Sequence, residues 1–185
     1  MRRKPEYVRV IGIDPSYAKG ITYCAVQIQK NPTRINEIKI KYECHGTVKG
    51  NSPMTSIELL KEVNVENKLK TFAVIEDCYL RSNASVLRKL AMVIGSIVNF
   101  MERNQVQHEL VLNTHWERGL YKGVGFNEER KRQIKKAIIK EDFAASWDLT
   151  QIGVENLNDD EIDAFMLARH GALKLKQDYM LSQSG

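Results

Sequence analysis

Short apolar runs alternate with longer helical stripes along this chain of 185 residues. Residues 8–26 begin with a β-branched run that ends in Asp14, and a turn with Pro15 and Gly20 leads into a second apolar run. This pattern predicts two antiparallel strands joined by a turn. Residues 34–48 alternate apolar and polar side chains, which predicts a third, half-exposed strand and hence an antiparallel meander.

The rest of the pattern predicts alternating helices and strands. The expected elements are, in chain order, a helix over residues 52–68, a buried strand over 71–76, a helix over 82–103, a strand over 108–113, a loop over 114–126, a basic helix capped by Asn127, and a last helix that begins at Asn158. The helix over 82–103 carries two apolar stripes and therefore needs two partners. One stripe should face the sheet, and the other is expected either in the same core or against a second copy of the protein.

The composition is that of a soluble globular chain. A hydrophobic content of 43% is enough for one core, so we expect residues 1–178 to form a single domain and residues 179–185 a disordered tail. The three cysteines are odd in number and lack close pairing, which argues against a disulfide framework or a zinc site. The longest apolar stretch, residues 90–101, is too short to span a bilayer. We expect a cytoplasmic, nucleoid-associated protein, or one in the host cytoplasm if a phage encodes it.

Charge is unevenly distributed along the chain. Residues 1–80 carry 13 Lys and Arg against 9 acids, residues 81–140 carry 12 against 5, and residues 141–185 carry 3 against 9, which gives net charges of +4, +7 and −6. A basic middle and an acidic end suit a protein that attracts a polyanion and holds cations where the two segments meet. The alternative is a solvated surface with a random asymmetry.

Four acids stand at positions where they could meet. Asp14 and Glu76 each end an apolar strand, and Asp160 and Asp163 lie three apart on one face of the last helix. Taken singly, these acids also fit a turn and the capping of a helix start. Taken together, they form an oxygen-rich set that suits Mg²⁺ or Mn²⁺, and two such ions can promote phosphodiester hydrolysis.

The loop and the basic helix have compositions that suit nucleic-acid contact. The loop over 114–126 mixes aromatic, basic and glycine residues, and the helix after it is rich in lysine and arginine. The candidate DNA contacts are Arg118 and Lys122 in the loop and Arg130, Lys131, Arg132 and Lys135 on the helix. A basic helix surface taken alone is more often a solvated face.

Three motifs in this order resemble the RuvC family of Holliday junction resolvases within the ribonuclease H-like superfamily. They are GIDPS at 12–16, IED at 75–77 and DEIDAFMLA at 160–168, with the basic helix before the last of them. The resemblance covers residues 7–175 and implies an α/β fold, in which three antiparallel and two parallel strands form a five-stranded mixed sheet flanked by helices. It also implies a homodimer that cuts two strands of a four-way DNA junction symmetrically.

The same resemblance implies roles for individual residues. Asp14, Glu76, Asp160 and Asp163 match the catalytic acids, which would hold two Mg²⁺ ions, with Mn²⁺ as a substitute. Lys131 falls near a family lysine that approaches the scissile phosphate, and Arg118 is similar in placement to another basic residue. Tyr79 is similar in placement to an aromatic residue that stacks on bases at the junction centre. The turn departs from the family pattern, because Ser16 stands where glycine is usual.

Other functions share parts of this pattern. A ribonuclease H-like nuclease could act instead on flaps, forks or structured RNA, because phosphate contacts carry no information about substrate shape. An actin-like nucleotide-binding protein also begins with Gly-Ile-Asp and a turn, but it needs a second Asp-X-Gly loop, and no Asp in this chain is followed two residues later by Gly. A DNA-binding module without catalysis would leave the four acids unexplained.

Overall fold

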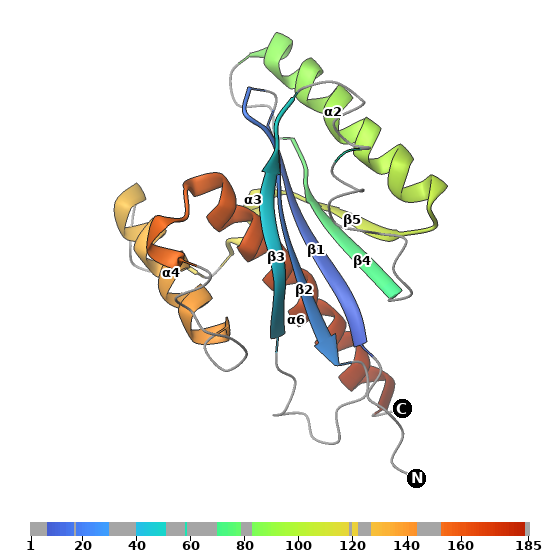
Figure 1. Ribbon diagram of the computed structural model, residues 1–185, viewed down its shortest axis with the longest axis vertical. Helices are drawn as coiled ribbons and strands as arrows, with labels where there is room; N and C mark the ends of the chain where they lie inside the picture. The colour runs from blue at the N-terminus through green and yellow to red at the C-terminus, as the bar shows by residue number, and fades with distance from the viewer. Residues whose placement is uncertain are drawn as a thin grey trace.

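The chain folds around one mixed β-sheet (Figure 1). The computed structural model describes residues 7–16, 18–29, 40–50, 58, 70–78, 83–118, 120–121, 127–143 and 153–183. The strands are β1 (Tyr7–Ser16), β2 (Gly20–Gln29), β3 (Ile40–Val48), β4 (Lys70–Glu76) and β5 (Gln107–Val111). The helices are α2 (Ala84–Arg103), α3 (Asn113–Trp116), α4 (Glu128–Phe143) and α6 (Asp159–Gln183), with a short 3₁₀ turn at Val154–Asn156.

The sheet has the order β3-β2-β1-β4-β5. β1, β2 and β3 pair antiparallel, and β4 and β5 run parallel to β1. This arrangement confirms the predicted meander followed by two parallel strands. β1 lies at the centre because both of its faces are apolar, as central strands of such sheets require.

Alternate residues of β1 enter two separate cores. Val8 and Val10 pack with the residues of α6 on one face of the sheet, whereas Ile11 and Ile13 pack with the residues of α2 on the other face. This separation follows from the two-residue period of a strand. The predicted helices therefore cover opposite faces of one sheet (Figure 1).

The element boundaries differ from the expected ones at several positions. α2 begins at Ala84, because the side chain of Asn83 accepts hydrogen bonds from the backbone N–H groups of the first turn. The strand expected over 108–113 ends at Val111, and Asn113 opens the short helix α3 inside the expected loop. α6 continues to Gln183, past residue 179 where the tail was expected to begin, since residues 179–183 lack Gly and Pro. Tyr79, Lys122 and the helix expected over 52–68 lie outside the described residues, apart from Glu58.

The long helix α2 is only partly covered. Val93, Ile94, Ile97 and Met101 are buried against the sheet, while Met92 is 66% exposed. In length and composition α2 could cross a membrane, contrary to the expectation that no stretch could, and it alone among the described helices meets this test. The core helix of a soluble protein passes the same test, and α2 contributes four buried residues to the core under the sheet.

Candidate active site

Two of the predicted acids lie side by side because of strand register. The parallel ladder between β1 and β4 ends at the pair Ile13 and Ile75, so Asp14 and Glu76 are the next residues on the two neighbouring strands. Their carboxyl groups are close enough to shift the pKa of each other. The structure thus brings together two acids that are 62 positions apart in the sequence.

A glycine brings the third and fourth acids to the same place. A methyl group on Gly12 would lie 2.2 Å from the carbonyl oxygen of Ala164, so only glycine lets α6 rest directly on β1. Further along, Gly171 lies against Val10, which means that α6 runs antiparallel to β1. The first turn of α6 therefore reaches the end of β1 that carries Asp14.

The start of α6 is capped by residues other than the two predicted aspartates. The side chain of Asn158 accepts a hydrogen bond from the N–H of Glu161 at 3.0 Å, and the Glu161 side chain accepts one from the N–H of Asn158 at 2.9 Å. This reciprocal capping box satisfies the helix end. The side chains that cap this turn in the described residues belong to Asn158 and Glu161, so capping does not account for Asp160 and Asp163.

The four carboxylates interact electrostatically. Burial raises the pKa of Asp14 well above its ordinary value, and the charges of Glu76, Asp163 and Asp160 raise it further. Burial and the charge of Asp163 likewise raise the pKa of Glu76 to about 7. Burial raises the pKa of Asp163 as well, although Lys135 opposes this effect. Such a group of acids favours a bound proton or a bound cation.

Two lysines contact the aspartates of α6. The ammonium group of Lys135 lies 2.6 Å from Asp163 Oδ1 and 2.9 Å from Glu117 Oε1. Burial lowers the pKa of Lys135, but the charges and hydrogen bonds of Asp163 and Glu117 outweigh it and raise the pKa overall. Lys19, in the turn between β1 and β2, contacts both carboxylate oxygens of Asp160, at 3.0 and 2.8 Å. Sequence reasoning missed this role of Lys19, because nothing near it in the sequence indicates a partner 141 positions away.

The lysine beside the acids is Lys135, not Lys131. Lys131 lies one helical turn earlier on the same side of α4 and pairs with Glu128 at 2.8 Å. Lys135 also lies over the ring of Trp116, with 4.8 Å between its Nζ and the ring centroid, and these contacts fix its position. The sequence offered several adjacent basic residues, and only the packing of α4 on α6 distinguishes them.

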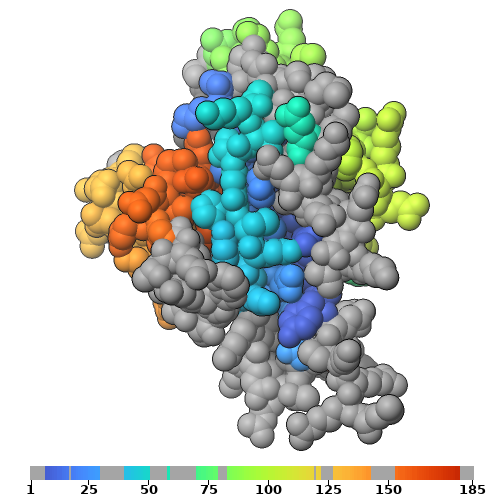
Figure 2. All heavy atoms as spheres, viewed as in Figure 1, coloured from blue at the N-terminus to red at the C-terminus, as the bar shows by residue number. Residues whose placement is uncertain are grey.

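The remaining candidate DNA contacts lie around the same helix. Arg132 pairs with Asp159 at 3.0 Å, and Arg118 and Arg130 are exposed. Trp116 is 6% exposed and belongs to the core, so this aromatic residue of the loop cannot stack on a nucleic acid. The space-filling view shows α4 and the start of α6 side by side, next to β3 (Figure 2).

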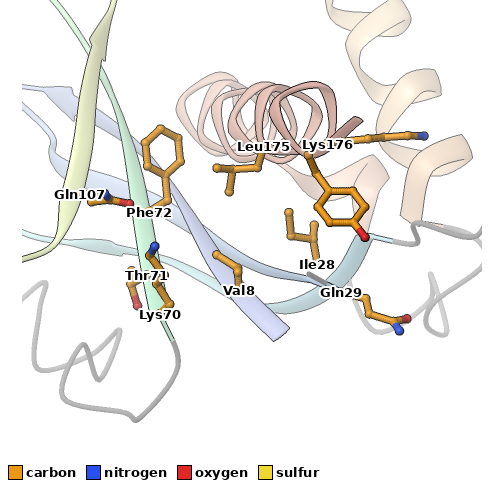
Figure 3. A pocket seen from close by; sticks show the side chains of 10 residues that line it. Val8, Ile28, Gln29, Lys70, Thr71, Phe72, Gln107, Leu175 and Lys176 are labelled. Atoms are coloured by element: carbon orange, nitrogen blue, oxygen red, sulfur yellow. The ribbon is translucent and has the colours of Figure 1, made fainter. Parts of the chain in front are cut away.

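Open space lies next to the acids. A pocket of about 240 Å³ is lined by Asp14, Pro15, Glu76, Asp77, Cys78, Leu90 and Asn113. A second pocket, of about 250 Å³, lies between the starts of α4 and α6 and includes Lys135 and Asp163. A more apolar pocket of about 140 Å³ lies at the opposite end of the sheet, around Val8, Phe72 and Leu175 (Figure 3), and contains none of the four acids.

The side chains at this edge fit a hard divalent cation by their chemistry. Carboxylate oxygens are the usual protein ligands of Mg²⁺ and Mn²⁺, and a cation would relieve the repulsion that raises the pKa of Asp14. Among the residues that the structure describes, no three His, Cys, Asp or Glu side chains already surround one point. Asp160 and Asp163 are instead ion-paired with Lys19 and Lys135.

Solved structures resemble the fold of this chain. No protein family and no curated protein matches the sequence. Thermus thermophilus RuvC matches with a TM-score of 0.60 and 13% identity over 96% of this chain and 97% of that one. RuvC from the same organism in complex with a Holliday junction substrate matches with a TM-score of 0.61 and 11% identity, over 95% and 96% of the two chains.

A third solved structure comes from a different source. The yeast mitochondrial Holliday junction resolvase Ydc2 matches with a TM-score of 0.59 and 13% identity, over 96% of this chain and 82% of that one. These similarities extend over nearly the whole chain. The chain therefore has the ribonuclease H-like α/β fold of the RuvC resolvases, as the three sequence motifs predict.

Proposed function

We propose that this protein is a metal-dependent endonuclease that resolves four-way DNA junctions. The observation that carries the proposal is the meeting of Asp14, Glu76, Asp160 and Asp163 at one edge of the sheet, with a capping box that leaves the two α6 aspartates for another role. The fold supports it, since one similar structure is a RuvC bound to a Holliday junction substrate.

The four acids would hold Mg²⁺, with Mn²⁺ as a substitute, and two ions per site would suit the four carboxylates. When bound, such ions polarise the phosphate and activate water for hydrolysis. Burial and neighbouring charges raise the pKa values of Asp14 and Glu76, so these groups would release a bound proton as a cation fills the site.

Lys135 is better placed than Lys131 to act on the scissile phosphate. Its ammonium group is held at the acids by Asp163 and Glu117, and a cation fixed beside a phosphate stabilises the charge that develops during hydrolysis. Lys131, Arg132, Arg130 and Arg118 would contact the DNA backbone further from the cut. Tyr79 and Lys122 remain candidate DNA contacts from the sequence resemblance alone.

Symmetric cleavage of a junction needs two active sites, so we also propose a homodimer. The open face of α2 is the candidate contact, since Met92 is 66% exposed and a methyl group added at Gly95 would meet no other part of the protein within 4 Å. The second apolar stripe seen in the sequence is a poorer candidate, because Val93 is buried and Phe100 packs against the core of the same chain.

The test is the replacement Asp14→Asn, with cleavage and binding of a synthetic four-way junction measured in Mg²⁺. We expect cleavage to fall by at least about a thousandfold, in the range of losses seen when a catalytic group is removed, while binding stays within a few-fold. The variant should fold, because the substitution removes a charge whose burial is unfavourable. Asp178→Asn, at an exposed position of α6, is the matched control and should cleave normally.

Substrate comparison tests the rest of the proposal. A junction, a flap, a replication fork, a linear duplex and an RNA hairpin should be offered to the wild-type protein in Mg²⁺. Preference for the junction supports a resolvase, and preference for a flap, a fork or RNA would instead indicate another nuclease with this fold. Normal cleavage by Asp14→Asn would refute the assignment of the four acids as the active site.

A further inference from the structure

A side chain outside the four acids completes the same edge of the sheet. Asn113 is the first residue of α3 and follows the end of β5 by two positions. β1, β4 and β5 are adjacent parallel strands, and near the corresponding end of each one stands an oxygen-bearing residue, namely Asp14, Glu76 and Asn113. All three line the pocket of about 240 Å³.

The side-chain oxygen of Asn113 lacks a partner. Asn113 Oδ1 is buried and accepts no hydrogen bond, and an acceptor left this way costs about 1–3 kcal/mol. Two other buried polar atoms make no hydrogen bond in the described part of the chain, and both are donors: Trp116 Nε1, and Arg132 Nε, which instead lies 3.0 Å from Asp159 in an ion pair. Among the described residues, Asn113 Oδ1 is therefore the one buried side-chain acceptor without a hydrogen bond.

Helix capping does not explain this asparagine. The N-cap position of α3 is Leu112, and no side chain makes a capping hydrogen bond there. The backbone carbonyl of Asn113 accepts the hydrogen bond that begins the helix, from the N–H of Glu117 at 3.0 Å. The side chain is therefore not needed for the local structure.

The surroundings of the pocket indicate what kind of ligand Asn113 would take. Its polar neighbours there include Asp14, Glu76 and Asp77, which are acceptors when ionised. Because its neighbours are also acceptors, the side-chain oxygen of Asn113 can be satisfied only by a cation or by a hydrogen-bond donor that enters the pocket. Amide oxygens are common ligands of hard divalent cations, together with carboxylates.

We propose that Asn113 is a further metal ligand, which supplies its amide oxygen, directly or through water, to the divalent cation held by Asp14 and Glu76. This inference rests on the proposed function, since it assumes a metal at the four acids. It assigns that cation to the side of the site formed by β1, β4 and β5, away from the Asp160 and Asp163 side, where the lysines bind.

The test is Mn²⁺ binding, measured by titration calorimetry without DNA, so that it does not depend on cleavage. Asn113→Leu should weaken Mn²⁺ binding by at least about tenfold, the scale on which groups around a metal act, without lowering the melting temperature of the metal-free protein. Asn113→Ala should give the same result if leucine disturbs folding. Asn113→Asp should retain or strengthen binding, because it keeps an oxygen ligand and adds charge. The control Asn156→Leu lies at an exposed position outside the site and should bind Mn²⁺ like the wild type.

The outcomes separate this inference from the proposed function. If Asp14→Asn loses Mn²⁺ binding and both Asn113→Leu and Asn113→Ala bind as tightly as the wild type, the role of Asn113 is refuted while the metal site stands. If the wild-type protein binds no Mn²⁺, both proposals fail. If Asn113→Asp binds Mn²⁺ as weakly as Asn113→Leu and Asn113→Ala, the amide acts as a hydrogen-bond donor. That result also overturns the assignment of Asn113 as a metal ligand.

Discussion

At the scale of single residues, position in the fold gives similar acids different environments. Asp14 is buried beside Glu76. Burial raises the pKa of both carboxyl groups, the charge of Glu76 raises the pKa of Asp14 further, and the charge of Asp163 raises that of Glu76. Asp160 and Asp163, one helical turn apart, are instead neutralised by lysines from two different elements. The two strand acids also feel the charge of Asp163, and the protonation of Glu76 can be tested directly.

Glu76 should make the metal-free protein less stable as the pH rises. Because the pKa of Glu76 is about 7 in the folded protein against an ordinary 4.5, the folded state binds this proton more tightly than the unfolded chain. The contribution of Glu76 to the free energy of unfolding should then fall between about pH 4.5 and pH 7, by about 3 kcal/mol. Glu76→Gln should remove most of this slope in urea unfolding measured with a chelator.

The control for this prediction is Glu102→Gln, which alters an exposed acid of α2. It should keep the slope of the wild type. A wild-type protein that is more stable at pH 8 than at pH 5 would contradict the prediction, and so would an unchanged slope in Glu76→Gln.

At the scale of elements, the site depends on how closely α6 approaches β1. Gly12 and Asp14 lie two positions apart and so point to the same face of the strand. The glycine removes the side chain that would hold α6 away, and the aspartate then meets the first turn of the helix. The GIDPS motif thus combines a packing residue with a chemical one.

Gly12→Ala should destabilise the protein strongly. The new methyl group would lie 2.2 Å from a carbonyl oxygen and 2.3 Å from a backbone nitrogen of α6, and overpacking against a backbone costs about 3 kcal/mol or more. Denaturant unfolding measures the effect. The control Gly95→Ala places a methyl group in open space on a helix and should be neutral or stabilising by up to about 1 kcal/mol. Equal stability of the two variants would show that close helix packing is not required.

At the scale of the whole molecule, the basic middle of the chain meets its acidic end. Arg132 pairs with Asp159, Lys135 with Asp163, and Lys140 with Glu155, so several cations of α4 are engaged by the segment that follows. Part of the uneven charge of the sequence therefore holds α4 beside α6. The exposed cations of α4 remain available to bind a polyanion.

The open face of α2 tests the proposed dimer. Met92→Lys would place a charge at the expected contact, and we expect the dimer to dissociate at least about tenfold more readily, a difference of about 1.4 kcal/mol. Sedimentation equilibrium measures the change. Gln177→Lys adds the same charge at an exposed position of α6 and should leave assembly unaltered. A wild-type protein that stays monomeric at high concentration would refute the dimer.

The sequence by itself determined the strand and helix types, the antiparallel meander and the four candidate acids, because these depend on local periodicity and on short motifs. It could not decide which lysine of α4 stands at the acids, that Lys19 reaches Asp160, or that Asn113 lines the same pocket. Those facts depend on the register of β1 with β4 and on the contact of α6 with Gly12. Only tertiary structure fixes such relations, since they join residues that local patterns treat as independent.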